Sequence, residues 1–148
     1  MRAFSKVFTP HYYVEEGDCS IELKLSWGKG TFEVDGQTYE LRREGLFFGA
    51  FELVHDGEVL ARGEKRPFGS FVEIDIGDYT CTLHKTSIFG TGFGLYEADE
   101  QVGSIARKGW FTSEITADLE FIRSLPVRIF VLWLFLRLDA RDDASADE

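Results

Sequence analysis

The chain has 148 residues, a length typical of one domain, and it is long enough to bury a sizeable core without disulfides or a metal. It carries 16 lysines and arginines against 26 aspartates and glutamates, and the net charge of −10 argues against a dedicated nucleic-acid-binding protein. Hydrophobic residues make up 44% of the chain, which excludes wholesale disorder, and the 14 Phe and 15 Gly favour a β-rich fold.

A unit of about 21 residues recurs along the chain, marked by a turn dipeptide and, about twelve residues later, a phenylalanine. The turn pairs are Asp35-Gly36, Asp56-Gly57, Gly77-Asp78 and Asp99-Glu100, and the phenylalanines are Phe47, Phe68, Phe89 and Phe111. Asp-Gly between alternating residues indicates a β-hairpin, because a type I′ turn needs two positive φ angles. Around Asp56-Gly57 we expect Val54 to face Val59 and Leu53 to face Leu60.

This pattern predicts about twelve antiparallel strands, near residues 4–8, 11–15, 19–26, 30–34, 37–43, 48–54, 59–64, 70–76, 79–85, 92–97, 101–107 and 113–119. A meander of that length leaves no unpaired edge strand if it closes on itself, so we expect a mainly β, closed antiparallel barrel. Such a barrel is wider than strand side chains alone can fill, and it needs a plug.

The plug that we predict is the segment LPVRIFVLWLFLRL, residues 125–138. It follows Ser124, a residue type that caps helices, and Pro126 is tolerated in a first turn. A helix that is apolar on all faces is a buried helix, so we expect it to thread the barrel. The alternative is a helix packed across the open mouth of a sandwich.

The longest uncharged run in this helix, Ile129 to Leu136, is only eight residues, which is too short to span a membrane. We therefore expect no transmembrane span, although a tail-anchored protein is a third possibility. Residues 139–148 carry a net charge of −4 and no large apolar side chain, which predicts a disordered acidic tail behind a single domain of residues 1–138.

The units FELVHDGEVLARGEKRPFGSFVEI and FGLYEADEQVGSIARKGWFTSEITADL, with the final LPVRIFVLWLFLRL, resemble the tubby C-terminal-like superfamily. Within it, the likeness is to the LURP-one-related and phospholipid-scramblase-like branch and its small bacterial members. The resemblance covers roughly residues 11–138 and implies a twelve-stranded barrel around a central helix. It also implies lipid binding, since tubby domains bind phosphoinositide head groups through basic residues and scramblase-like members associate with membranes. The acidic balance of this chain departs from the strongly basic tubby domains, and no tubby lipid-binding motif maps onto it residue by residue.

Candidate metal ligands and nucleophiles are scattered along the chain. His11, His55, His84, Cys19 and Cys81 form no metal-ligand spacing, and a three-residue step along a strand places Cys81 and His84 on opposite faces. Two cysteines are no disulfide framework, and the first residues of the chain contain no apolar stretch of a secretory signal. We therefore expect reduced thiols, no metal, no cofactor, no enzymatic activity and a cytoplasmic location.

Basic residues recur just before each marker phenylalanine: Arg42, Arg43, Lys65, Arg66, Lys85, Arg107 and Lys108. Equivalent positions in a repeat fall at equivalent heights on a barrel, which predicts a basic rim beside Phe47, Phe48, Phe68, Phe89, Trp110 and Phe111. Cations and aromatic rings together suit an anionic membrane surface. The alternative is a solvated rim with the rings turned inward and with Glu44 and Glu64 diluting the positive field.

These observations predict a monomeric, non-catalytic binding module for anionic phospholipid head groups or for a protein partner. It would lie in the cytoplasm or at the inner face of the membrane. The alternative is a ligand-binding or enzymatic barrel with a pocket at one mouth, for which Glu73, Asp75 and His84 lie on neighbouring strands.

Overall fold

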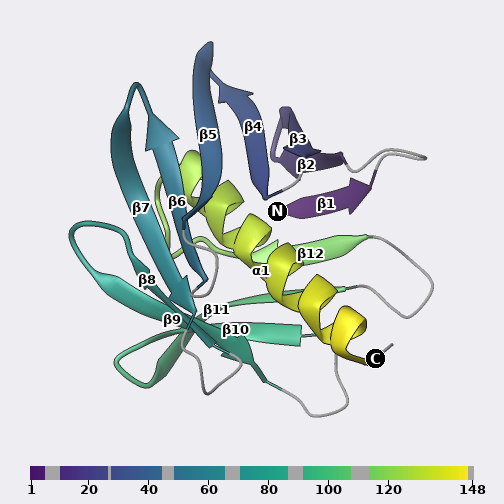
Figure 1. Ribbon diagram of the computed structural model, residues 1–148, viewed down its shortest axis with the longest axis vertical. Coiled ribbons are helices and arrows are strands. Elements are labelled where there is room, and N and C mark those ends of the chain that lie inside the picture. The colour runs from purple at the N-terminus through teal and green to yellow at the C-terminus, as the bar shows by residue number, and fades with distance from the viewer. Residues whose placement is uncertain are drawn as a thin grey trace.

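The computed structural model describes residues 1–5, 11–26, 28–44, 49–65, 71–86, 92–107 and 114–146, with side chains as far as Leu138. The described residues form twelve strands and one helix (Figure 1). In chain order these are β1 (Arg2–Ser5), β2 (Tyr12–Glu16), β3 (Cys19–Ser26), β4 (Lys29–Val34), β5 (Gln37–Glu44), β6 (Ala50–His55), β7 (Glu58–Lys65), β8 (Phe71–Asp75), β9 (Thr80–Lys85), β10 (Gly92–Glu97), β11 (Glu100–Arg107), β12 (Ile115–Asp118) and α1 (Leu125–Ala146).

The strands close into one antiparallel barrel, which confirms the predicted fold class. Each strand pairs with its neighbours in the chain, and β1 joins β12 through Arg2 opposite Thr116 and Ala3 opposite Ile115. Because all strands follow each other up and down, the barrel has two distinct ends. We call the end with the turns at residues 17–18, 35–36, 56–57, 77–78 and 98–99 the turn end, and the opposite one the loop end.

The tight turns have the backbone that the dipeptides predicted. Asp56 and Gly57 have φ angles of 50° and 78°, the two positive values of a type I′ turn. In the fourth unit the turn lies one residue earlier than expected. Ala98 and Asp99 hold the positive φ angles, 48° and 70°, so that Glu97 pairs with Glu100 across a two-residue loop.

A β-bulge corrects one predicted pairing. Val54 faces Val59 as expected, but Leu53 faces Ala61 and not Leu60, because the register shifts between Leu53 and Val54. The same shift recurs two repeats later between Leu95 and Tyr96. A bulge inserts one extra residue into one strand and increases the local twist, which a closed barrel requires.

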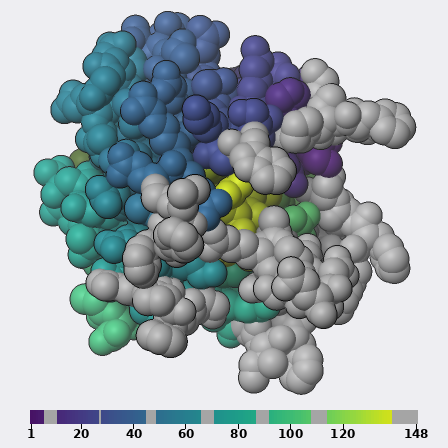
Figure 2. Space-filling model, in the orientation of Figure 1, coloured from purple at the N-terminus to yellow at the C-terminus, as the bar shows by residue number. Residues whose placement is uncertain are grey.

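The helix α1 threads the barrel interior (Figure 1). Its consecutive residues Ile129–Phe135 are at most 2% exposed, so every face of the helix is surrounded by strands. Trp133 packs edge-on against Phe51 of β6, with ring centroids 5.5 Å apart, and Phe135 packs in the same way against Phe93 of β10 at 5.2 Å. Figure 2 shows part of α1 at the centre of the molecule.

Two local features set the position of α1. The Ser124 hydroxyl accepts a hydrogen bond from the Val127 amide at 3.4 Å, which confirms the predicted cap. On β7, a Cβ at Gly63 would lie 3.0 Å from Leu134 Cδ1, so a glycine is needed where the helix approaches the strand closely. The helix therefore starts at the turn end, passes Gly63 and leaves the barrel at the loop end.

The helix is longer than predicted, because it continues to Ala146 through residues that we expected to be disordered. Forming the first turns of a helix is the unfavourable step, and the buried segment already provides these turns. Each further residue then extends an existing helix and adds one hydrogen bond. Within the described residues, no helix is long and apolar enough to cross a membrane.

Candidate functional site

Four of the predicted basic residues converge at the loop end of the barrel. Arg43, Lys65, Lys85 and Arg107 lie at or next to the last residue of β5, β7, β9 and β11. These four strands run in the same direction, from the turn end to the loop end, and alternate around the barrel. We call this set, Arg43, Lys65, Lys85 and Arg107, the basic mouth.

The residues of the basic mouth lie on the inner faces of their strands. Each follows by two positions a buried residue: Leu41, Gly63, Leu83 and Ile105 respectively. Because side chains alternate between the two faces of a strand, the four cations share the face that lines the interior. All four are only partly exposed, which fits inward-facing positions near the ends of their strands.

The basic mouth lies directly above the apolar layer of the core. Arg43 is opposite Phe51 and Lys85 is opposite Phe93, the two rings that pack against α1. The Nε atom of Arg43 is buried and has no hydrogen-bond partner among the described residues. A buried donor of this kind favours an anionic acceptor that reaches the mouth.

A fifth cation at this end, Arg137, was not among the predicted site residues. It is three residues beyond Leu134, the residue that packs on Gly63, and therefore about one turn closer to the loop end. In the sequence, Arg137 follows the last residues of the apolar run. Its place at the loop end could be inferred only from the direction of the helix, which starts at the turn end.

Arg42 does not belong to the basic mouth. It alternates with Arg43 and points to the outer wall, where it forms an ion pair with Glu40 at 2.8 Å. Both side chains are about half exposed, so this pair contributes little to stability. Arg66, Lys108 and the six aromatic residues expected beside the rim lie outside the described residues.

The pocket considered as an alternative lies on the outer wall and not at a mouth. Glu73 and Asp75 line a depression of about 460 Å³ together with Thr80, Thr82 and Tyr96. His84 is not among the lining residues, and its ring stacks on Tyr96 at 4.3 Å between centroids. These side chains face outward because the inner positions of β8 and β9 are taken by core residues packed toward α1.

Glu52 of β6 is a buried acid that the sequence pattern did not single out. It is 6% exposed, lies between Arg42 and Arg62 in the sheet register, and has its carboxylate 3.9 Å from the Arg62 guanidinium. Burial, and then the hydrogen bond and charge of the neighbouring Glu44, raise the pKa of Glu52 above its ordinary value of 4.5. The positive charges of Arg62 and Arg42 lower the pKa of Glu52, but by less than burial and Glu44 raise it.

We expect Glu52→Gln to make the protein more stable at pH 7 but not at pH 4. Above pH 4.5 the unfolded chain releases the Glu52 proton while the folded protein still holds it, so wild-type stability falls as pH rises through that window. The amide keeps the shape of the protonated acid and avoids this loss. Urea unfolding at the two pH values measures the difference. Glu58→Gln, at an exposed acid of β7, is the control, and an equal pH dependence of both variants would contradict the prediction.

The two cysteines have opposite environments. Cys19 is exposed, whereas Cys81 is 3% exposed and faces the interior. Burial, with a smaller contribution from the charge of Glu97, raises the pKa of the Cys81 thiol to about 12. Since the thiolate is the reactive form, Cys81 is not an activated nucleophile at neutral pH.

We expect one thiol of the native protein to react with a chromogenic disulfide reagent at pH 8, and the second to react only in urea. The Cys19→Ser variant would then show almost no reaction while folded. Rapid labelling of that folded variant would mean that Cys81 is accessible or activated, contrary to its burial and raised pKa.

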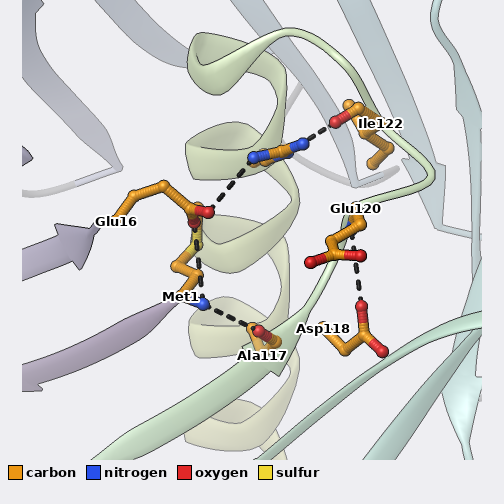
Figure 3. A network of polar contacts seen from close by, with 7 residues as sticks. Met1, Glu16, Ala117, Asp118, Glu120 and Ile122 are labelled. Carbon is orange, nitrogen blue, oxygen red and sulfur yellow. Dashed lines mark hydrogen bonds and ion pairs between the residues drawn. The ribbon is translucent and has the colours of Figure 1, made fainter.

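The turn end is held by a network around Glu16 (Figure 3). The Arg128 guanidinium of α1 lies 3.3 Å from the Glu16 carboxylate, and its Nε donates a hydrogen bond to the Ile122 carbonyl oxygen. The amino group of Met1 lies 3.6 Å from the same carboxylate and donates to the Ala117 carbonyl at 3.1 Å. The network joins the start of α1 to β2 and to the two strands, β1 and β12, whose pairing closes the barrel.

No family model, curated protein or solved structure matches this chain. Among the described residues, no group of three or more His, Cys, Asp or Glu side chains is arranged to hold a metal ion.

Proposed function

We propose that this protein is a non-catalytic binding module, related to the tubby-like barrels, that docks on anionic phospholipid head groups through the basic mouth. The observation that carries the proposal is the convergence of Arg43, Lys65, Lys85 and Arg107 on the inner rim of one end of the barrel. The four cations come from four separate strands, and Arg43 offers a buried donor without a hydrogen-bond partner among the described residues.

The expected energies are sufficient for reversible docking. Each lysine or arginine close to an anionic bilayer contributes about 1 kcal/mol, so four such residues contribute at most about 4 kcal/mol. The net charge of −10 repels such a surface at long range, but salt at physiological strength screens charges beyond about 8 Å. Short-range contact at the loop end therefore outweighs the acidity of the whole chain, and only this end faces the membrane.

We expect the protein to sediment with vesicles of phosphatidylcholine that contain phosphatidylserine, and not with phosphatidylcholine alone. Replacing Lys65 and Lys85 together by glutamine is expected to weaken this binding about 30-fold, from about 1 kcal/mol for each lost charge. The matched control replaces Lys24, on the outer wall, and Arg123, at the turn end, which removes the same charge elsewhere. Equal binding by the Lys65/Lys85 variant and the wild type would refute the proposal.

A further inference from the structure

The acidic tail, residues 139–148, leaves the barrel at the loop end, where the basic mouth lies. Leu138 is 6% exposed, so α1 is still inside the barrel at the last residue before the tail. The backbone helix then continues to Ala146, and Figure 1 shows the C-terminal turns of α1 emerging from the barrel. The tail has a net charge of −4, from five acids and one arginine. The direction of the helix therefore brings this negative charge to the end of the barrel that carries the four cations.

The tail begins close to the level of these cations. Phe135 packs edge-on against Phe93, with ring centroids 5.2 Å apart, and Phe93 is directly opposite Lys85 in the sheet register. Asp139 is four residues beyond Phe135, which places its backbone about 6 Å farther along the helix axis. Salt at physiological strength screens charges only beyond about 8 Å. This short rise therefore leaves the first acid of the tail within the field of the basic mouth.

The sequence of the tail does not favour the helix that it forms. Negative charges at the C-terminal end of a helix oppose its macrodipole, and the last turn of α1 contains no basic residue. Aspartate has a low helix propensity. Asp139 and Asp143 are four residues apart, a spacing at which like charges destabilise a helix. Positive charge from outside the tail would offset all of these effects, and the basic mouth places such charge at this end of the barrel.

We propose that the acidic tail is an autoinhibitory segment of the basic mouth. Its carboxylates lower the positive potential of the loop end and repel anionic head groups, so the tail and a membrane compete for the same four cations. This inference rests on the proposed lipid docking and describes its regulation. Neutralising or displacing the tail strengthens docking.

The first test neutralises the tail in the full chain. Asp139→Asn, Asp142→Asn and Asp143→Asn together keep the shape of the side chains and remove three negative charges. We expect this tail variant to bind phosphatidylcholine vesicles that contain phosphatidylserine about tenfold more tightly than the wild type, which corresponds to about 1.4 kcal/mol. Co-sedimentation over a series of lipid concentrations measures the two affinities.

The matched control removes the same charge at exposed positions of the turn end, through Asp18→Asn, Glu58→Gln and Glu100→Gln. From Glu58 to Lys65, β7 spans about 23 Å, well beyond the screening length, so this variant is expected to change binding by no more than about twofold. Binding of the tail variant with wild-type affinity, or an equal gain in both variants, would overturn the autoinhibition alone. Binding by none of the three proteins would refute the lipid docking on which it rests.

A second test needs no lipid. If the basic mouth stabilises the tail, replacing Lys65 and Lys85 by glutamine should unfold the helix over residues 139–146. In backbone NMR spectra of the full chain, the Cα chemical shifts of these residues are expected to move toward random-coil values and their amides to exchange faster. Replacing Lys24 and Arg123 by glutamine is the control and is expected to leave the tail unchanged. The same tail helix in both variants and the wild type would show that the basic mouth does not stabilise it, and would overturn the proposal.

Discussion

Replacing Trp133 by alanine is expected to lower the free energy of unfolding by about 3–5 kcal/mol. Trp133 is 2% exposed and lies in the middle of α1, where its ring meets Phe51 of β6 and Phe130 of the helix itself. Alanine leaves a cavity between the helix and the barrel wall. Both are held in place by the other strands, so neither can move to fill it.

This loss is large compared with the 5–15 kcal/mol that separates folded from unfolded states in most domains. Urea unfolding followed by far-ultraviolet circular dichroism measures it. Arg123→Ala, at an exposed position just before the helix, is the control and is expected to change stability by no more than about 0.5 kcal/mol. A similar, small effect of both substitutions would show that α1 is not the centre of the core.

Replacing Arg128 by methionine is expected to cost about 2 kcal/mol, the second largest effect. Methionine keeps the apolar stem but removes the guanidinium that contacts Glu16 and the Ile122 carbonyl oxygen. A hydrogen bond to a charged group contributes about 1.5–3 kcal/mol when it is buried, and Arg128 is 17% exposed. A cation near the start of a helix is unfavourable by itself, so the loss of this residue is felt through its tertiary contacts.

A double-mutant cycle isolates the contact. Glu16→Gln combined with Arg128→Met is expected to cost less than the sum of the two single substitutions, by about 0.5–3 kcal/mol. Arg42→Met is the matched control, because Arg42 pairs with Glu40 at 2.8 Å on the surface, where both side chains are about half exposed. We expect that substitution to cost about 1 kcal/mol or less. Additive effects of the Glu16 and Arg128 substitutions would mean that the network does not couple the helix to β2.

The turn dipeptides and the alternation of apolar residues along the strands predicted the architecture well. Asp56-Gly57 and the equivalent pairs locate the hairpins, because few residues accept positive φ angles at two successive positions. Alternation along each strand and the apolar 125–138 segment then indicate a closed barrel with a helix inside, and the structure has both. The candidate site was predicted only in part. The recurrence of basic residues indicated their common height, but adjacent positions such as Arg42 and Arg43 end on opposite faces of one strand.

Turn conformation and side-chain alternation depend on residues close together in the chain, so the number of strands, their order and the buried helix could be predicted without the structure. Which cations share the inner rim, and that the ladder between β3 and β4 ends at the pair Lys24 and Thr31, followed only from the three-dimensional structure. These features depend on register and on charges brought together from distant parts of the chain. A register shift of one residue, such as the bulge at Leu53, changes which residues face each other across two strands. It does not change the alternation of apolar and polar residues along either strand.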